Sequence, residues 1–350
     1  MQSYEEEWLA GQPILRAILH CVGLFDRPAS GDCLEALRAK PPILGLTDEI
    51  VKLDERGWRR NIARLREVRL LAPADPTDPE ALDAHPLVRE WFGDRLRQTN
   101  EAAWKAAHSR LYDHLRRTTR EGFAPTLHDL APLYHAVGHG CLAGRQQDAL
   151  EKVYINRICR WQVDGVPEFY SFKRLGAVSS DLAALSWFFD RPYETPASVF
   201  GPLHQSWLLS EAGARLRAHG RLPEALAAMR TGLQMTDGAG SWRNTAAAAS
   251  NLSQTELLIG EVAAALAAAE TAVELADRSA DTFLMVDNRV HRAVVLHAAG
   301  QWAKAADLFA DAARQQPKSE PATHCSTRLG VIITASCCCR RVGPTTRENT

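Results

Sequence analysis

The sequence predicts an all-α protein in which a small helical domain leads into a solenoid of stacked helix pairs. Three segments repeat one pattern at an interval of forty residues, a glycine followed five residues later by an alanine: Gly220–Leu226, Gly260–Leu266 and Gly300–Ala306. Glycine is the usual residue just past a helix end, and a fixed period indicates structural units that stack on one another. Aromatic residues make up only 7% of the chain, which favours closely packed helices.

Composition narrows the functional classes. The 350 residues suffice for two domains, and 41 Lys and Arg against 42 Asp and Glu give a net charge of -1, which is no global signature of nucleic-acid binding. The start, Met1–Trp8, is acidic and unlike a signal peptide, and no apolar run reaches membrane-spanning length. Eight cysteines without a C-x-x-C pair predict reduced thiols, and hence a cytoplasmic protein without a membrane partner.

Residues 1–99 are expected to form a winged-helix-like domain. Apolar residues from Ile14 to Val22 share one helical face, Ser30 or Asp32 caps a second helix, and a third begins near Trp58. Short strands are predicted at residues 70–72 and just before residue 85, on either side of a proline-rich loop. This order of helices, strand, loop and strand is that of a winged helix.

Residues 100–200 are predicted to be a helical linker with degenerate helix pairs. Asn100 caps a helix that carries Trp104, and the pattern from Gly144 to Leu150 matches the later repeats, so helix pairs are expected from about residue 127. Residues 165–200 are rich in aromatic side chains, with a helix near 174–189. An aromatic core at a solenoid joint explains them better than a ligand pocket does.

Residues 201–317 contain the three clear repeats. In the middle one, apolar residues from Val262 to Ala276 recur at steps of three and four, which is one face of a helix, and the partner helix is expected from Thr245 to Ile259. Small residues occupy equivalent places in all three repeats, where a larger side chain would overpack a helix contact. They are Gly213, Ser253 and Ala293 in the first helices, and Gly232, Ala272 and Ala312 in the second.

These residues resemble tetratricopeptide (TPR) repeats. Each TPR has a small residue in its first helix, a turn, an alanine that opens the second helix and a later small residue, and Pro317 lies where a TPR proline closes the unit. The period is 40 residues here against the usual ~34. The excess is expected between the repeats, at residues 236–240 and 277–281.

The resemblance to TPR proteins implies a protein or peptide partner on the concave face, which the first helices form. The candidate residues there are Arg217, Ser250, Asn251, Gln254, His291 and His297. TPR domains that bind chaperone tails hold a terminal carboxylate with a Lys/Asn/Arg clamp, and only Asn251 fits it, so that ligand is rejected. For each of these polar residues a solvated helix face is the simpler alternative.

The first half of the chain resembles STAND NTPases, the NB-ARC and NACHT-like signalling ATPases. The segment Ala84–Glu90 resembles the MHD-type motif that ends their winged-helix domain, although Ala84 and Pro86 depart from it. The segments Leu24–Pro28 and Ala131–Tyr134 also resemble bacterial members with TPR tails, and the resemblance extends over residues 4–316. It implies that His85 senses the β-phosphate of ADP. A capping or core histidine is the alternative.

No phosphate-binding loop of the form G-x-x-x-x-G-K-[ST] occurs in the sequence. The chain is therefore expected to be the noncatalytic interaction and sensor portion of such an ATPase, without its nucleotide-binding domain. It would bind no cofactor itself, and ATP or ADP only if that domain is supplied. The trigger, the oligomeric state and whether the chain is complete stay open.

Two other interpretations compete with this one. A transcription regulator would bind DNA through Arg59, Arg60, Arg64 and Arg66 on the third helix, although nearby acidic residues and the balanced charge disfavour nucleic acid. The second competing interpretation is a truncated, decayed gene product. Residues 318–350 are irregular, with Cys337–Cys339 beside two arginines, and a frameshift between residues 318 and 324 would explain them.

His135 and His139 lack a third ligand and a catalytic glutamate, so no metal site and no catalytic residue are predicted.

Overall fold

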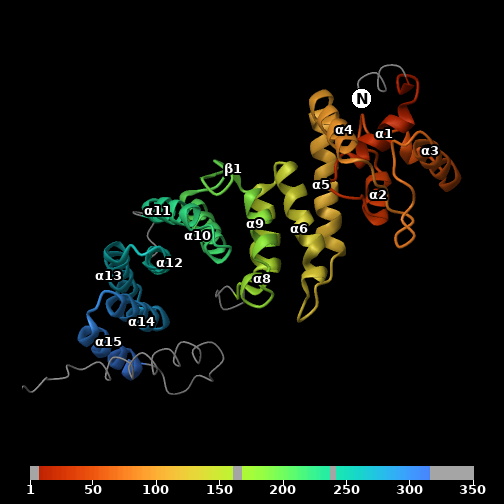
Figure 1. The fold of residues 1–350 in the computed structure, drawn as a ribbon. Helices are drawn as coiled ribbons and strands as arrows, with labels where there is room; N and C mark the ends of the chain where they lie inside the picture. Colours follow the sequence, from red (N-terminus) through yellow and green to blue (C-terminus); the bar gives the residue numbers. More distant parts are fainter. Residues whose placement is uncertain (1–7, 161–167, 237–241, 316–350) are drawn as a thin grey trace, which may run out of the picture. The chain divides into compact units, whose positions relative to one another are not determined.

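The computed structural model describes residues 8–160, 168–236 and 242–315, and helices dominate them (Figure 1). The all-α class predicted from the sequence is confirmed. The chain divides into two compact units, Met1–Ser180 and Asp181–Thr350, which are described separately. The helices of the first unit are α1 (Pro13–Val22), α2 (Gly31–Arg38), η2 (Ile50–Lys52), α3 (Glu55–Glu67), α4 (Pro86–Thr99), α5 (Glu101–Thr118), α6 (Leu127–Leu142), α7 (Gln146–Asp148), the π-helical η3 (Ala149–Ile158) and α8 (Tyr170–Lys173).

Side-chain caps fix where the helices of the first unit begin. Helix α5 starts as predicted, because the side chain of Asn100 accepts a hydrogen bond from the amide of Ala103 at 3.0 Å. Helix α3 starts three residues earlier than predicted. The carboxylate of Asp54 accepts the amide of Gly57 at 2.7 Å, so the helix is capped there rather than at the first buried apolar residue, Trp58.

The two short strands predicted around the proline-rich loop are wrong as strands. Ala29 and Leu82 form an isolated antiparallel bridge, with N–O distances of 2.8 and 2.9 Å. The amide of Ala72 donates to the carbonyl of Asp83 at 2.8 Å. Proline has no amide to donate, so the loop between these segments cannot extend the pairing into a ladder. Three extended segments are thus joined by single pairs of residues.

Helices α1 and α4 cross at two glycines. A Cβ atom added at Gly93 would overlap the carbonyl oxygen of Gly23, and one added at Gly23 would overlap the amide nitrogen of Gly93. The backbone of Gly23, the residue after α1, touches that of Gly93 in α4, so neither of these two positions admits a side chain. It also fixes α4, whose first residue follows His85.

The second unit begins within α9 (Val178–Ser186), which is shorter than the helix predicted at 174–189. A two-stranded antiparallel hairpin follows, formed by β1 (Phe189–Arg191) and β2 (Thr195–Pro196). The chain leaves the helix because Phe188 and Phe189 are both buried, and the ring of Phe188 packs edge-on against Phe200 with centroids 5.9 Å apart. The expected aromatic core therefore exists, around a hairpin that was not predicted.

A buried ion pair joins α9 to the first repeat helix. The guanidinium of Arg215 donates to the carboxylate of Asp181 at 3.0 Å, and it also binds Glu211 one turn earlier on its own helix. Arg215 is 1% exposed and Asp181 is 0% exposed. A charge this deeply buried is tolerated only with a partner, so the pair fixes α9 against α10.

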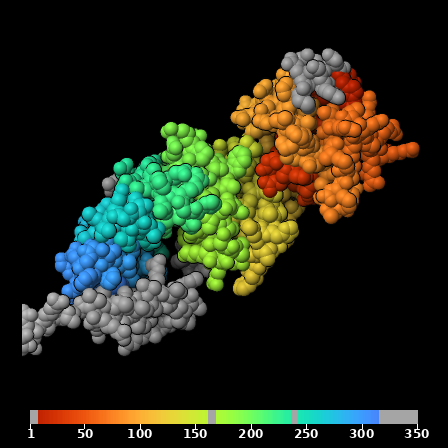
Figure 2. All heavy atoms as spheres, in the orientation of Figure 1, coloured from red at the N-terminus to blue at the C-terminus, as the bar shows by residue number. Residues whose placement is uncertain are grey.

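Six helices form the three repeats, and their atoms make up the green-to-blue part of Figure 2. They are α10 (Pro202–Ala218), α11 (Leu222–Thr236), α12 (Trp242–Leu258), α13 (Val262–Ser279), α14 (Thr282–Ala298) and α15 (Trp302–Gln315). Each first helix packs against the second helix of its own repeat, and α11 and α13 contact the repeat that follows. The first helices α10, α12 and α14 also contact one another in turn. This is the α-solenoid that the period predicted.

The glycines that punctuate the sequence end the helices as predicted. Gly220, Gly260 and Gly300 have φ angles of +82°, +86° and +75°, and Gly144 in the first unit has +78°. In all four turns the amide after the glycine donates to a carbonyl five residues earlier, at 2.8 to 2.9 Å. This left-handed ending satisfies the last carbonyls of the helix and reverses the chain.

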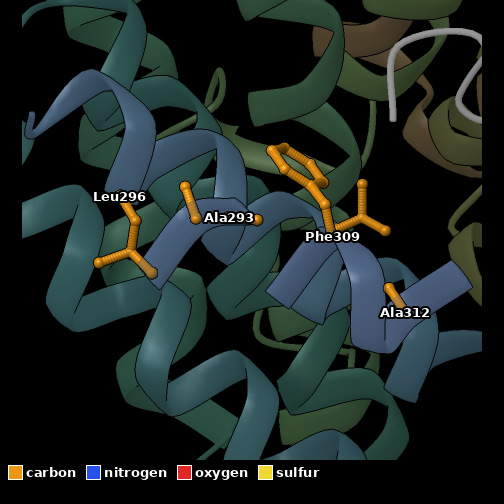
Figure 3. Packing of buried hydrophobic residues seen from close by; sticks show 6 residues of the cluster. Ala293, Leu296, Phe309 and Ala312 are labelled. Atoms are coloured by element: carbon orange, nitrogen blue, oxygen red, sulfur yellow. The ribbon is translucent and has the colours of Figure 1, made fainter. Parts of the chain in front are cut away.

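The small residues predicted at the helix contacts are confirmed. A Cβ atom on Gly213 would lie 2.6 Å from the Cγ atom of Met229, and the hydroxyl of Ser253 donates to the carbonyl of Ala265 at 2.6 Å. In the third repeat, residues of α14 and α15 form one apolar cluster, and four of them are labelled in Figure 3: Ala293, Leu296, Phe309 and Ala312. Small side chains bring the helices close enough for the larger ones to interlock.

The prediction that residues 277–281 form a connection between two repeats is wrong for most of these residues. Helix α13 continues to Ser279 and α14 begins at Thr282, so most of those residues extend a helix. Asp281 is the N-cap residue of α14, and its carboxylate accepts a hydrogen bond from the amide of Leu284 at 3.0 Å. Residues 237–240, Pro317 and the tail 318–350 lie outside the described residues. Among the described helices, none is long and apolar enough to cross a bilayer.

Replacing Gly93 with alanine is expected to destabilise the protein by about 2 kcal/mol, because the new methyl group must displace the backbone of Gly23. A loss of stability would be informative, because alanine in a helix interior is otherwise favoured over glycine by about 1 kcal/mol. The measurement is the urea midpoint. Gly11→Ala is the matched control, because a Cβ atom there meets nothing within 4 Å. Equal midpoints for both variants would contradict the close crossing.

Candidate interaction surface

The concave-face candidates come from α10, α12 and α14, which contact one another across successive repeats. The structure places the candidates in two kinds of position. Some bridge neighbouring helices, and others remain on the surface of a single helix. This distinction decides which side chains are available to a partner.

Arg217 and Asn251 join α10 to α12. The guanidinium of Arg217 donates to the backbone carbonyl of Asn251 at 3.0 Å and to its side-chain oxygen at 3.4 Å. A further contact reaches the hydroxyl of Thr255 at 3.5 Å. Both side chains are half-buried. These two predicted residues therefore lie together, and part of their hydrogen-bonding capacity holds two repeats in register.

His291 joins α14 to α12 through Ser253, with 2.9 Å between the imidazole Nε2 atom and the hydroxyl oxygen. The single hydroxyl proton of Ser253 is donated to the carbonyl of Ala265, so the Nε2–H group of His291 must be the donor. Burial, and then the positive charge of Arg217, lower the pKa of His291 to about 4. The ring is therefore neutral near pH 7, and its role here is to connect two repeats.

The other three candidates differ in exposure. Ser250 is 5% exposed, and its hydroxyl has no hydrogen-bond partner among the described residues. Gln254 is half-buried and His297 is exposed. No described contact joins these three to one another. Gln254 and His297 are therefore the candidates that a partner could reach most directly, and Ser250 is not.

His85 caps α4. Its imidazole Nδ1 atom accepts the amide of Leu87 at 3.3 Å, so the capping histidine considered from the sequence is what the structure shows. The side chain is exposed. In the neutral ring an accepting Nδ1 atom leaves the proton on Nε2, which can donate to another group. Capping therefore leaves His85 one donor at a helix N-terminus.

The four arginines of the DNA-binding alternative lie on α3, and three of them have partners within the protein. Arg59 pairs with Glu55 at 2.9 Å, Arg64 lies over the ring of Trp8 at 5.6 Å, and Arg66 donates to a backbone carbonyl. Arg60 is exposed. Neutralised or stacked guanidinium groups are less available to phosphates, so this helix offers a weaker surface than its sequence indicated.

His135 and His139 lie on α6 but engage different partners. His135 contacts Arg27, and the Nδ1 atom of His139 is 2.9 Å from that of His108 on α5. Burial lowers the pKa of both His135 and His139 to about 4 and that of His108 to about 2, with further lowering from neighbouring positive groups. Neutral rings paired in this way stabilise the α5–α6 contact.

One group of described residues has the spacing of metal ligands: Asp32, Cys33 and His114 offer ligand atoms within 4.8 Å of one another. The carboxylate of Asp32 already binds the imidazole of His114 at 2.9 Å. Burial raises the pKa of Cys33 to about 11, so its thiol is protonated near pH 7. These contacts explain the cluster as the tether between α2 and α5.

Sequence reasoning missed the residues that join helices through buried polar contacts, above all Asp181 and Arg215. The spacing in the sequence could have indicated that Arg215 is buried, because it lies three residues after Ala212 and directly before Leu216, which are both buried on α10. Its partner lies 34 residues earlier, and no local pattern connects the two.

Acidification is expected to weaken the contact between α12 and α14. The unfolded chain protonates His291 near pH 6.5, whereas the folded protein does so only near pH 4, so stability falls as the pH drops from about 6.5 to 4. The loss is at most about 3 kcal/mol at pH 4. Urea unfolding of the wild type and His291→Phe across this range measures it. The variant should lose less stability on acidification, and a difference that is independent of pH would contradict the assignment.

No protein-family model matches the chain, and no curated protein matches it. Among solved structures the chain is similar to the crystal structure of a signal transduction ATPase with numerous domains (STAND), with a tetratricopeptide repeat sensor, from Pyrococcus horikoshii. The identity is 12% and the TM-score 0.41, with 93% of this chain and 47% of the other covered. The chain thus spans about half the length of that protein. A likeness at this score carries no argument about function.

Proposed function

We propose that the repeats α10–α15 are the noncatalytic protein-binding surface of a STAND-type signalling ATPase. The observation that carries the proposal is that polar side chains join the first helices of successive repeats, Arg217 of α10 to Asn251 of α12 and His291 of α14 to Ser253 of α12. Stacked helix pairs of this kind bind extended or helical peptide segments more often than they catalyse reactions. The partner is therefore a protein segment, and its identity stays open.

The side chains that would contact the partner are those with capacity left after the repeats are joined. Asn251 accepts from Arg217 with its side-chain oxygen, which leaves its NH₂ group available as a donor. Gln254 lies one turn further along α12, and His297 is exposed near the end of α14. Amide and imidazole groups bind peptide backbones without requiring a charged ligand, which fits the rejection of a carboxylate clamp.

Residues 1–99, for which the sequence predicts a winged-helix-like domain, would supply the response. In this proposal the exposed Nε2–H group of His85 donates to the β-phosphate of ADP held by a nucleotide-binding domain, and partner binding at the repeats releases that closed state. The capping geometry supports the role, because a donor beside the first amides of α4 lies where an anion is favoured. This part of the proposal follows the family resemblance of residues 84–90.

Peptide selection tests the interaction surface. Peptides enriched from a phage-displayed library on the purified chain are expected to bind the Gln254→Lys, His297→Glu double variant at least about tenfold more weakly, which corresponds to about 1.4 kcal/mol. The matched control, Thr271→Lys with Ala303→Glu, places the same residues at exposed positions of α13 and α15 and should bind normally. Equal binding to both variants, or no enriched peptide, would contradict the proposal.

Sequencing the locus on both sides of the coding region tests the role of His85. The expected result is an in-frame domain with a glycine-rich, lysine-containing phosphate loop. In the protein that contains it, His85→Asn should lower ADP retention about tenfold while folding normally, because asparagine also caps helices well. A locus without such a domain, or unchanged ADP retention, would exclude this role and leave the peptide-binding proposal standing.

A further inference from the structure

An arginine-rich pocket of about 1440 Å³ lies within the first unit. It is lined by the end of α5, the loop that follows it, the end of η3 and the start of α8. Six arginines line it: Arg116, Arg117, Arg120, Arg157, Arg160 and Arg174. Among the described residues, the other charged members of the lining are two glutamates, so this described lining is strongly positive although the chain as a whole is balanced.

The two glutamates leave much of this charge uncompensated. Glu121 is fully engaged by Arg157, whose guanidinium also lowers the pKa of that carboxyl. Glu168 lies 3.8 Å from Arg174. Neither Arg117 nor Arg120 has a carboxylate partner among the described residues, and both side chains are exposed. The Nε atom of Arg117 donates to the backbone carbonyl of Asp113 at 3.1 Å, and the remaining N–H donors of these two exposed guanidinium groups are available to a ligand.

The loop that carries these arginines is held in place by the deeper ones. Arg157 donates to the carbonyls of Arg116 at 2.5 Å and Thr119 at 2.9 Å. Arg160 donates to the carbonyl of Phe123 at 2.5 Å. Gly122 turns the chain with a φ angle of +65°, which other residues rarely adopt. These contacts hold the loop in place without a ligand, so the free energy of binding is not reduced by a loss of loop entropy.

The anchored loop presents an aromatic ring. Phe123 lines the pocket and is 94% exposed, although its own carbonyl is fixed by Arg160. Arg160 also lies over the ring of Tyr170, another lining residue, at 5.0 Å. Guanidinium groups bind phosphates with paired N–H donors, and exposed aromatic rings stack on nucleobases. The pocket therefore combines the two recognition elements of a nucleotide.

We propose that this pocket binds a nucleotide ligand, free or within a single strand, with Arg117 and Arg120 on its phosphates and its base stacked on Phe123. Typical pockets for small ligands measure ~300–1,000 Å³, so the volume accommodates more than one nucleotide. The site is separate from α3 and from His85. It requires neither the repeat surface nor a nucleotide-binding domain, so it stands independently of the proposed function.

Fluorescence anisotropy of the full chain with a labelled ten-nucleotide oligouridylate tests the proposal. Arg117→Glu with Arg120→Glu should weaken binding at least about tenfold and reduce the salt slope by about 1.4, since two phosphate contacts of a single strand are lost. Phe123→Ala should weaken binding about tenfold through lost stacking. The matched charge-reversal control is Arg56→Glu with Arg69→Glu, at exposed positions on and just after α3, and it should bind normally.

Competition distinguishes the two sources of the ligand. Displacement by ATP, with binding that depends on Phe123, assigns the site to free nucleotides. Displacement only by unlabelled oligouridylate assigns it to a single strand. Tripolyphosphate that competes as well as ATP, while Phe123→Ala binds normally, overturns the proposal, as does the absence of saturable binding at low salt. Equal weakening by the control variant also overturns it. Circular dichroism and thermal melting establish that each variant is folded.

Discussion

The direct contact of helix backbones at small residues is the constraint on which both units depend. At the α1–α4 crossing two glycine backbones touch, and in the first repeat Gly213 leaves only enough space for Met229. Helices that approach this closely have one relative placement, because a shift along either axis would bring a side chain into the contact. The first contact holds α4, and with it His85, against α1, and the second holds α10 against α11.

Alignment of the repeats in turn determines what their polar side chains do. Arg217 reaches Asn251 and His291 reaches Ser253 because each lies one repeat away on a neighbouring helix. Such contacts hold the solenoid together and also order the surface that a partner would meet. A polar side chain on α10, α12 or α14 can thus be part of the protein's own structure and part of the proposed binding surface, and exposure separates the two roles better than residue type does.

Local signals made the repeat fold predictable, and long-range partnerships explain what was missed. A glycine in a left-handed conformation and a small residue at a fixed spacing act within one helix pair, so the turns at Gly220 and Gly260 could be predicted from the sequence. The ion pair of Arg215 with Asp181 and the arginine pocket each require residues more than 30 positions apart. Within the candidate surface, the positions of the residues were predictable, whereas the burial of Ser250 was not.

The neighbour-to-neighbour contacts of the repeats have a mechanical consequence. Each helix pair contacts the pairs before and after it, so a small change in angle at one junction adds to changes at the others along the array. Bending of the solenoid is therefore shared among several junctions between repeats and is not confined to a single hinge. A segment bound along α10, α12 and α14 would span two of these junctions and would reduce the bending of the solenoid over that length.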